Sequence, residues 1–345
     1  MAKAGLELSV EEKIELITRH LVSDEAQTLF NDEARADLKA ILAVRPLKIY
    51  WGTATTGSPH IAYFLPIAKI ADFLRAGCEV KILLADLHAF LDAEKAALEV
   101  LPHRAVYYKA VITTMLESIG APMEKLQFVR GTSFQMEADY TLDMYRLAAK
   151  ITQRNAKKAG AEVIKQVEDH SALSGLLYPL LQVLDEEYLH VDAQFGGLDQ
   201  RKIFVMAQEV LPKYLGYKKR IHFMNPMVPS LELDSKNNKK MSSSSGSKID
   251  LLDSPAVVEK KIAQAYAKPK MVENNGLLAF VRLVLFPLVK DFVVRRKEEH
   301  GGDVIFTTYA EVEAAYASGS LFPLDLKHAV ALAINRLLER KITRP

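Results

Sequence analysis

The stretch KIYWGTATTGSPHIAYF, residues 48–64, changes character twice along its length. It begins as an apolar run typical of a β-strand, crosses a loop of glycine and threonine, and then takes the spacing of an amphipathic helix. Pro59 suits the first position of that helix and Ser58 its cap, so we expect His60 in the first turn. Backbone N–H groups and the helix dipole favour an anion there, which predicts a phosphate site. The same residues are also compatible with a capped helix that carries a histidine on the protein surface and binds no phosphate.

Further short apolar runs repeat the strand pattern along the chain. With the first, the strand candidates are residues 47–52, 78–86, 125–131, 188–196 and 221–228. Longer helical patterns separate them, for example at residues 60–77 and 106–120. Strands that alternate with helices pair in parallel through right-handed crossovers, so the sequence predicts an α/β fold with a Rossmann-like open sheet. Ligands of such sheets bind at the carboxyl ends of the strands.

The pattern changes beyond about residue 250, where amphipathic helical segments follow one another without obvious strands between most of them. These segments are residues 254–266, 274–289 and 324–342. We therefore expect a helical segment at 1–45, an α/β domain at 46–245 and a mainly helical domain at 246–345. In the first part, Ser9 and Glu12 fit a helix-capping box.

The composition is that of an ordinary globular protein, with 49% hydrophobic and 26% charged residues among 345. The formal net charge of +2 argues against a protein that coats nucleic acid with its whole surface, but it leaves room for a local basic face. Cys78 is the single cysteine, which rules out an internal disulfide and a cysteine-based metal cluster and fits a reducing compartment. Neither a signal peptide nor an apolar run of ~18 residues is present, so we expect a cytoplasmic protein without membrane spans.

A serine-rich run, KKMSSSSGS at residues 239–247, has the composition of a linker between the two domains. Its part KMSSS, at 240–244, resembles the KMSKS signature of class I aminoacyl-tRNA synthetases, and PHIAY at 59–63 resembles their HIGH signature. The segments at 50–57 and 175–204 are similar to tyrosyl-tRNA synthetases of archaea and of the eukaryotic cytosol. The resemblance extends roughly from residue 12 to residue 340.

A tyrosine pocket follows from this resemblance. Tyr178, Gln182 and Asp185 are spaced to share one helix face, which could present a hydroxyl, an amide and a carboxylate to a small ligand. The resemblance implies that Tyr50 and Asp185 hydrogen-bond the phenol hydroxyl, and that Tyr178, Gln182 and Gln200 hold the α-ammonium end. Such a pocket rejects phenylalanine because its own buried polar groups would stay unpaired; a factor of ~10⁵ is known for tyrosyl-tRNA synthetases as a class.

The resemblance also implies the ATP site and the catalytic groups. Amino-acid activation uses the substrate carboxylate as nucleophile, so the protein supplies position and phosphate-stabilising donors. The catalytic candidates are His60, Lys240, Ser242, Ser243 and Ser244. The ATP-binding candidates are Gly52, Thr53, Gly57, His60, Tyr63, Gly197, Asp199, Lys240 and Met241. We expect Mg²⁺ to accompany ATP and predict no protein metal site and no permanently bound cofactor. Lys240 to Ser244 would close over ATP, and residues 245–247 would be flexible spacer.

The helical domain is expected to bind the anticodon of tRNA(Tyr), by the same resemblance. Its candidate contacts are Asp325 for base edges and His300 or Phe322 for stacking on an unpaired base. The resemblance further implies a homodimer with the insertion at about 100–165 in contact, and we expect the contact near residues 132–150. Asp86 and His88 lie at a strand end on the expected ligand edge, but their roles stay open, since Asp86 could equally cap the next helix.

Three other functions are compatible with parts of the sequence. A tryptophanyl-tRNA synthetase shares the expected architecture, although Tyr50 with Asp185 favours a phenol over an indole. A non-catalytic RNA-binding paralogue would not need His60, Lys240 and the pocket residues. A nucleotidyltransferase of the same superfamily but with a different function would not need the helical domain.

Overall fold

The computed structural model describes residues 8–92, 96–164, 172–231 and 248–339. These residues form two compact units that do not follow chain order. The first contains the chain up to Thr56, Lys69–Lys109 and Ala121–Pro226, and the second contains Gly57–Ala68, Ala110–Gly120 and the chain from Met227. The segment with the HIGH-like signature therefore groups with the carboxyl-terminal part of the chain.

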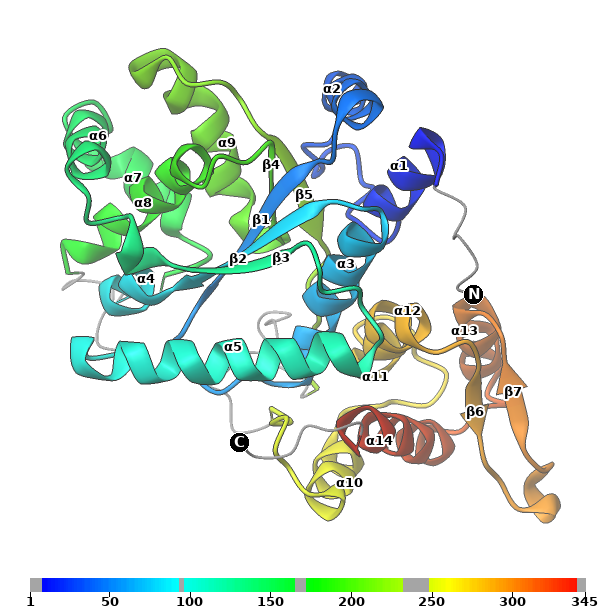
Figure 1. Cartoon of the computed structure of the whole chain (residues 1–345). Helices are drawn as coiled ribbons and strands as arrows, with labels where there is room; N and C mark the ends of the chain where they lie inside the picture. Colours follow the sequence, from blue (N-terminus) through cyan, green and yellow to red (C-terminus); the bar gives the residue numbers. More distant parts are fainter. Residues whose placement is uncertain (1–7, 93–95, 165–171, 232–247, 340–345) are drawn as a thin grey trace. The chain divides into compact units, whose positions relative to one another are not determined.

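The first unit is built on a sheet whose strands are all parallel (Figure 1). Its strands are β1 (Lys48–Ala54), β2 (Glu79–Ala85), β3 (Leu126–Arg130), β4 (Ala193–Gly197) and β5 (Ile221–Asn225). Their order is β3-β2-β1-β4-β5, so the direction of winding reverses between β1 and β4. Tyr50 lies in register with Lys81 on one side and Gln194 on the other, in the middle of the sheet. The predicted Rossmann-like α/β fold is confirmed, and its switch point is the expected place for a ligand.

The strand positions agree with the sequence except at the fourth strand and at the end of the fifth. Residues 188–192 belong to the end of a helix and a turn, in which His190 has a positive φ of 52°, and β4 begins only at Ala193. The helix continues to Tyr188 because its apolar residues still pack against neighbouring helices. The fifth strand ends at Asn225, before Pro226, which lacks the N–H that a sheet needs.

Helices surround this sheet. They are α1 (Val10–Thr18), α2 (Asp32–Val44), α3 (Phe64–Arg75), α4 (Asp86–Leu91), α5 (Leu101–Ser118), α6 (Ala138–Ala148), α7 (Gln153–Gly160), α8 (Ser174–Tyr188) and α9 (Arg201–Val210). The division into two units runs through α3 and α5. The predicted capping box is confirmed, because the Ser9 side chain accepts from the Glu12 N–H and Glu12 accepts in turn from the Ser9 N–H.

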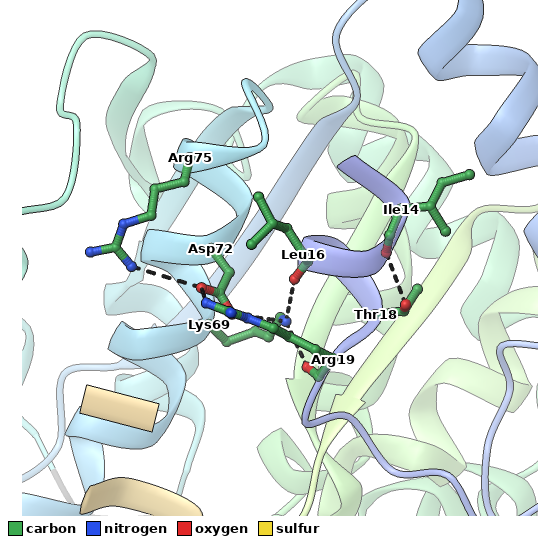
Figure 2. A network of polar contacts seen from close by, with 7 residues as sticks. All are labelled: Ile14, Leu16, Thr18, Arg19, Lys69, Asp72 and Arg75. Atoms are coloured by element: carbon green, nitrogen blue, oxygen red, sulfur yellow. Dashed lines mark hydrogen bonds and ion pairs between the residues drawn. The ribbon is translucent and has the colours of Figure 1, made fainter. Parts of the chain in front are cut away.

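A buried polar network attaches α1 to α3 (Figure 2). The last carbonyls of a helix have no partner inside it, and Lys69 Nζ donates to two of them, those of Leu16 (2.8 Å) and Arg19 (2.7 Å). Asp72 accepts from Lys69 (3.2 Å) and from Arg19 Nε (2.9 Å). Burial lowers the pKa of Lys69 to about 8, against the opposing effect of Asp72. The first helix is therefore part of the α/β unit.

The second unit is mainly helical, as expected. Its helices are α10 (Pro255–Gln264), α11 (Gly276–Phe280), α12 (Phe286–Leu288), α13 (Tyr309–Ser318) and α14 (Pro323–Glu339), with a π-helical turn at Val281–Leu285 between α11 and α12. An unpredicted antiparallel pair, β6 (Phe292–Val294) and β7 (Val304–Phe306), projects as a hairpin (Figure 1). Gly301 and Gly302 between these strands have φ of 93° and 70°, a conformation that glycine adopts without strain. Within the described parts of both units, no helix is long and apolar enough to cross a membrane.

Candidate active site

Asp185 on α8 is the centre of a buried polar cluster in the first unit. Its side chain is fully buried, and its Oδ1 accepts hydrogen bonds from Gln135 Nε2 (2.7 Å) and the Tyr140 hydroxyl (2.9 Å). Its Oδ2 accepts no hydrogen bond from any described residue, and the ring nitrogen Nε2 of His88 lies 3.7 Å away. One half of the carboxylate is thus fixed by the protein, and the other half is available to a ligand.

The loop after β3 brings Gln135 to this carboxylate. Asp86, at the end of β2, accepts from the N–H (2.9 Å) and the hydroxyl (2.7 Å) of Thr132, and so fixes the loop. A Cβ at Gly131 would clash with the ends of the Gln135 and Asp86 side chains, so a larger residue there would displace the two groups that order this loop. Asp86 is the first residue of α4 and its carboxylate orders the neighbouring loop, whereas the cap position of that helix is Ala85, without a side-chain cap.

Tyr50 lies on β1 and is only 1% exposed. Its hydroxyl donates a long hydrogen bond to the Gln182 carbonyl (3.4 Å). Burial raises the pKa of Tyr50 well above its usual value, and the nearby Asp185 carboxylate raises it further. The Tyr50 hydroxyl therefore lies against α8, the helix that carries Asp185.

The residues expected at the α-ammonium end also come together. Gln182 Nε2 donates to Gln200 Oε1 (3.0 Å), which joins α8 to the turn that follows β4. The Tyr178 ring packs edge-to-face on His88, with ring centres 4.6 Å apart. At Gly196 a Cβ would come within 3.0 Å of the Gln200 side chain and closer still to Phe204, so this glycine makes room for protein side chains.

The protonation of the cluster is set mainly by burial. Burial raises the pKa of Asp185 to about 7, against the lowering effect of the hydrogen bonds from Gln135 and Tyr140. Burial also lowers the pKa of His88 to about 4, so its ring is neutral at pH 7. A nearly neutral pocket with one free carboxylate oxygen is suited to accept a hydrogen bond from an uncharged hydroxyl.

The local prediction around His60 is wrong. Ser58 and Pro59 precede any helix, His60 forms an antiparallel bridge with Asp250, a 3₁₀ turn follows at Ile61–Tyr63, and α3 begins only at Phe64. The Ser58 hydroxyl accepts from Lys248 Nζ (2.9 Å) and caps no helix. Pairing with a segment about 190 residues away thus overrides the local helix-start signal.

His60 is also not a surface residue. Its side chain is 6% exposed and packs edge-to-face on Tyr63, with ring centres 5.4 Å apart. Burial lowers its pKa to about 4, and the Lys248 charge acts in the same direction. The imidazole is neutral at pH 7, so it is able to donate a hydrogen bond and supplies no positive charge. Its Nδ1 has no hydrogen-bond partner among the residues that the structure describes.

The other expected ATP contacts are only partly described. Gly52 and Thr53 lie in β1, Gly197 ends β4, and Asp199 lies in the 3₁₀ turn at Leu198–Gln200. A Cβ at Gly52 would meet its neighbours at 3.7 Å, an ordinary contact, so packing does not require glycine there. Gly57 and Tyr63 lie in the second unit. The remaining candidates lie outside the described residues, namely Lys240, Met241, Ser242, Ser243 and Ser244.

The expected RNA-contacting residues lie on the surface of the second unit. His300 ends a 3₁₀ turn between β6 and β7, and its side chain is 68% exposed. Phe322 is 63% exposed and directly precedes α14, while Asp325 lies half-buried in the first turn of that helix. Aromatic rings and a carboxylate on the surface are accessible to an unpaired base.

Gln135 and Tyr140 are the pocket residues that the sequence analysis missed. Gln135 was detectable in principle, since it follows a strand end on the ligand edge, next to a segment already considered. Tyr140 gave no such signal, because it looks like an apolar residue of an amphipathic helix. No cluster of three or more potential metal ligands occurs in the described part of the chain.

Comparison with known proteins decides the family. Residues 43–339 match the family model described as tRNA synthetases class I (W and Y). The chain belongs to this family. The resemblance to tyrosyl-tRNA synthetases of the eukaryotic and archaeal type is confirmed by its relatives, which bear that name.

Two curated relatives illustrate how similar this chain is to known synthetases. The cytoplasmic tyrosine–tRNA ligase of Danio rerio is 57% identical over 335 residues, which are 97% of this chain and 61% of the relative. The one of Saccharomyces cerevisiae is 50% identical and is covered over 82% of its length. The chain therefore spans less than two thirds of the vertebrate relatives that it matches.

A solved structure extends the similarity to three dimensions. The tyrosyl-tRNA synthetase of Archaeoglobus fulgidus, complexed with L-tyrosine, has a TM-score of 0.84 at 35% identity, and the match covers 96% of this chain and 98% of that one. A tryptophanyl-tRNA synthetase from Aeropyrum pernix, at 16% identity and a TM-score of 0.67, shares the fold.

Proposed function

We propose that this synthetase activates L-tyrosine with ATP and transfers it to the 3′ end of tRNA(Tyr). The observation that carries the proposal is the buried Asp185 carboxylate, with Oδ1 bound by Gln135 and Tyr140 and Oδ2 without a hydrogen bond from a described residue. A phenol hydroxyl would satisfy Oδ2, and Tyr50 would supply the second polar contact. The relatives named tyrosine–tRNA ligase support the same substrate.

The first reaction step needs no nucleophile from the protein. A carboxylate oxygen of tyrosine attacks the α-phosphorus of ATP, and the bond from that phosphorus to the leaving oxygen breaks. Tyrosyl-adenylate and pyrophosphate are formed. Gln182 and Gln200 would orient the amino acid from its α-ammonium end, which fixes the attacking oxygen.

The neutral His60 would donate a hydrogen bond to phosphate oxygens as charge develops in the transition state. Positive charge in this role falls to Lys240, with Ser242, Ser243 and Ser244 as further donors. We propose that ATP enters with Mg²⁺, as nucleotides do in other phosphoryl-transfer enzymes.

The second reaction step places tyrosine on a terminal hydroxyl of tRNA(Tyr), with AMP as leaving group. We propose that the second unit holds the anticodon through Asp325 and through stacking on His300 or Phe322. The exposure of both rings supports this role, because an exposed aromatic ring offers a face to an unpaired base.

We propose a homodimer because large apolar side chains are exposed on α6 and on the residues just before it. Met136, Leu142 and Tyr145 are 70%, 48% and 67% exposed, an unusual density of large apolar side chains within ten residues. A second copy of the chain would bury them. A cytoplasmic location is proposed from the names of the relatives.

ATP–pyrophosphate exchange with each of the twenty amino acids tests the proposal. Exchange that depends on tyrosine, followed by charging of tRNA(Tyr), is the expected result. Exchange that depends on tryptophan would identify a tryptophanyl-tRNA synthetase instead. The absence of exchange with every amino acid would contradict the proposal, and tRNA binding without exchange would favour a non-catalytic RNA-binding protein.

A further inference from the structure

Asn225 is the last residue of β5, and its amide group is buried without a hydrogen bond. The side chain is 3% exposed, yet neither Oδ1 nor Nδ2 has a partner among the residues that the structure describes. Most buried polar side chains have at least one partner, so a buried amide with two unpaired atoms calls for an explanation. A bound ligand or an ordered water would supply the missing bonds.

The amide lies at the edge of the sheet where ligands of parallel α/β folds bind. Asn225 ends β5 and is in register with Gly197, which ends β4. Gly197 is itself a candidate ATP contact. Because β4 borders the point where the winding of the sheet reverses, the amide is one strand away from the expected ligand position.

Asn225 and Gly197 face the same side of the sheet, the side that carries α3. Side chains alternate along a strand, and Phe223, two residues before Asn225, packs on Phe73 of α3 with ring centres 6.0 Å apart. Phe195, two residues before Gly197, packs on the same ring at 5.2 Å. Gly197 adds no side chain that could pair with the amide, so the amide is left for a ligand.

The candidate tyrosine pocket lies on the other side of the sheet. Tyr50 of β1 donates to the Gln182 carbonyl of α8, and Nε2 of His222 on β5 lies 2.6 Å from the Glu186 carboxylate of the same helix. Asn225 is three residues from His222, so it points away from α8. The amide is therefore not a further contact of the amino acid, and ATP is the other substrate that this edge of the sheet must hold.

The chemistry of the amide matches one nucleobase. An asparagine side chain offers one acceptor oxygen and an NH₂ donor. Adenine presents the complementary pair, because its 6-amino group donates and its N7 accepts, and asparagine pairs with this edge of adenine in DNA. Guanine presents two acceptors at the same edge, so the amide oxygen would remain unpaired.

We propose that Asn225 binds the adenine base of ATP, with Oδ1 accepting from the 6-amino group and Nδ2 donating to N7, and so selects ATP over GTP. This inference rests on the proposed function, because it takes ATP as the nucleotide substrate. The base supplies the hydrogen bonds that the amide lacks in the ligand-free protein.

Tyrosine-dependent ATP–pyrophosphate exchange by Asn225→Leu tests the proposal, since leucine keeps the shape of the side chain and removes its polar atoms. We expect kcat/KM for ATP to fall about 10–100-fold, and the preference for ATP over 7-deaza-ATP, which lacks N7, to fall from about 10-fold to about 1. The preference over 2′-deoxy-ATP should not change. The matched control is Asn335→Leu, at a buried amide on α14 of the second unit, which should leave all of these ratios at the wild-type value.

Thermal unfolding separates a binding role from a structural one. An asparagine that holds the fold together is costly to remove, whereas an unpaired buried amide is replaced by an apolar side chain of the same shape without loss of stability. We expect the Tm of ligand-free Asn225→Leu to equal or exceed that of the wild type. The rise in Tm on addition of ATP should be smaller in the variant.

Three results would overturn the proposal. They are an unchanged preference for ATP over 7-deaza-ATP in Asn225→Leu, a changed preference over 2′-deoxy-ATP, which would place the amide on the ribose, and a lower Tm of the ligand-free variant. Calorimetric titration of ATP without tyrosine distinguishes this failure from that of the proposed function. If ATP binding weakened in Asn225→Leu but the wild type showed no exchange with any amino acid, only the proposed function would be contradicted.

Discussion

The pocket around Asp185 and the surface around His300 and Phe322 are both candidate recognition sites, but they are built in opposite ways. In the pocket, polar groups are buried, and most of them are already bound to one another. On the surface of the second unit, the two aromatic rings are more than 60% exposed. The polar groups of the first site are fixed by one another, whereas the rings of the second are open to solvent.

This difference has an energetic meaning. A buried polar atom without a partner costs about 1–3 kcal/mol, so a ligand that supplies the missing hydrogen bond is strongly preferred over one that does not. An exposed ring or carboxylate is already solvated, and a ligand only replaces the water molecules around it. We therefore expect mutations in the pocket to have larger effects than mutations on the surface.

The largest effect is expected for Asp185→Asn. With its oxygen held by Gln135 and Tyr140, the new amide would present its NH₂ group in place of Oδ2, so the acceptor for the phenol hydroxyl is lost. We expect kcat/KM for tyrosine in ATP–pyrophosphate exchange to fall about 10²–10³-fold. Asp37→Asn removes an exposed carboxylate on α2 and should leave exchange unchanged. Equal activity of the two variants would contradict the role of Asp185.

The same substitution should alter the dependence of stability on pH. The pKa of Asp185 is about 7 in the folded protein, above its usual value near 4, so the folded state holds a proton that the unfolded state releases. Its contribution to stability is complete below pH 4 and is lost as the pH rises to 7. Between pH 5 and 8 the wild type should lose about 3 kcal/mol more unfolding free energy than Asp185→Asn.

Denaturant unfolding at the two pH values measures this difference. The buried histidines act in the opposite direction, because their pKa values are lowered to about 4, but they are common to both proteins and cancel in the comparison. Parallel pH profiles of the two proteins would show that Asp185 is ionised throughout this range.

A smaller effect is expected for Asp325→Ala on the surface of the second unit. Losing one base contact typically costs about 1–3 kcal/mol, so aminoacylation should slow about 10–100-fold while tyrosine-dependent exchange stays at the wild-type level. Asp291→Ala, at another exposed carboxylate of this unit, is the matched control. A parallel loss in exchange and aminoacylation would argue against an anticodon role.

The smallest effect is expected for Tyr140→Phe. It removes the hydroxyl that donates to Asp185 Oδ1 and to the Leu181 carbonyl (2.8 Å) but keeps the ring packing, so about 1 kcal/mol of stability and roughly 5-fold in kcat/KM for tyrosine should be lost. Tyr214→Phe, at an exposed tyrosine elsewhere in the first unit, should change neither quantity. If Tyr140→Phe matched this control in kcat/KM, Tyr140 would not position the carboxylate.

The same two regions show what the sequence can and cannot predict. The sheet was predictable because buried parallel strands such as β1 and β2 are continuous apolar runs between helical patterns. Tyr178, Gln182 and Asp185 were predictable as one helix face from their spacing alone. These features depend on residues that are close in the sequence.

The features that were not predicted depend on residues far apart in the sequence. His60 pairs with Asp250, and no local signal tells that this pairing replaces the helix start expected at Pro59. Tyr140 reaches Asp185 across 45 residues, and a tyrosine on an amphipathic helix gives no sign of such a bond. The hairpin of β6 and β7 has strands of three residues, too short for a periodic pattern.

The central claim is that Tyr50 and Asp185 read the phenol hydroxyl of the substrate. The most direct test is the ratio of kcat/KM for tyrosine over phenylalanine in ATP–pyrophosphate exchange, measured for the wild type and for Tyr50→Phe. We expect a ratio of ~10⁵ in the wild type, the value known for tyrosyl-tRNA synthetases as a class, and a fall of about 10–100-fold in the variant, carried by slower use of tyrosine. An unchanged ratio in Tyr50→Phe, or a wild type that uses both amino acids equally, would contradict the account.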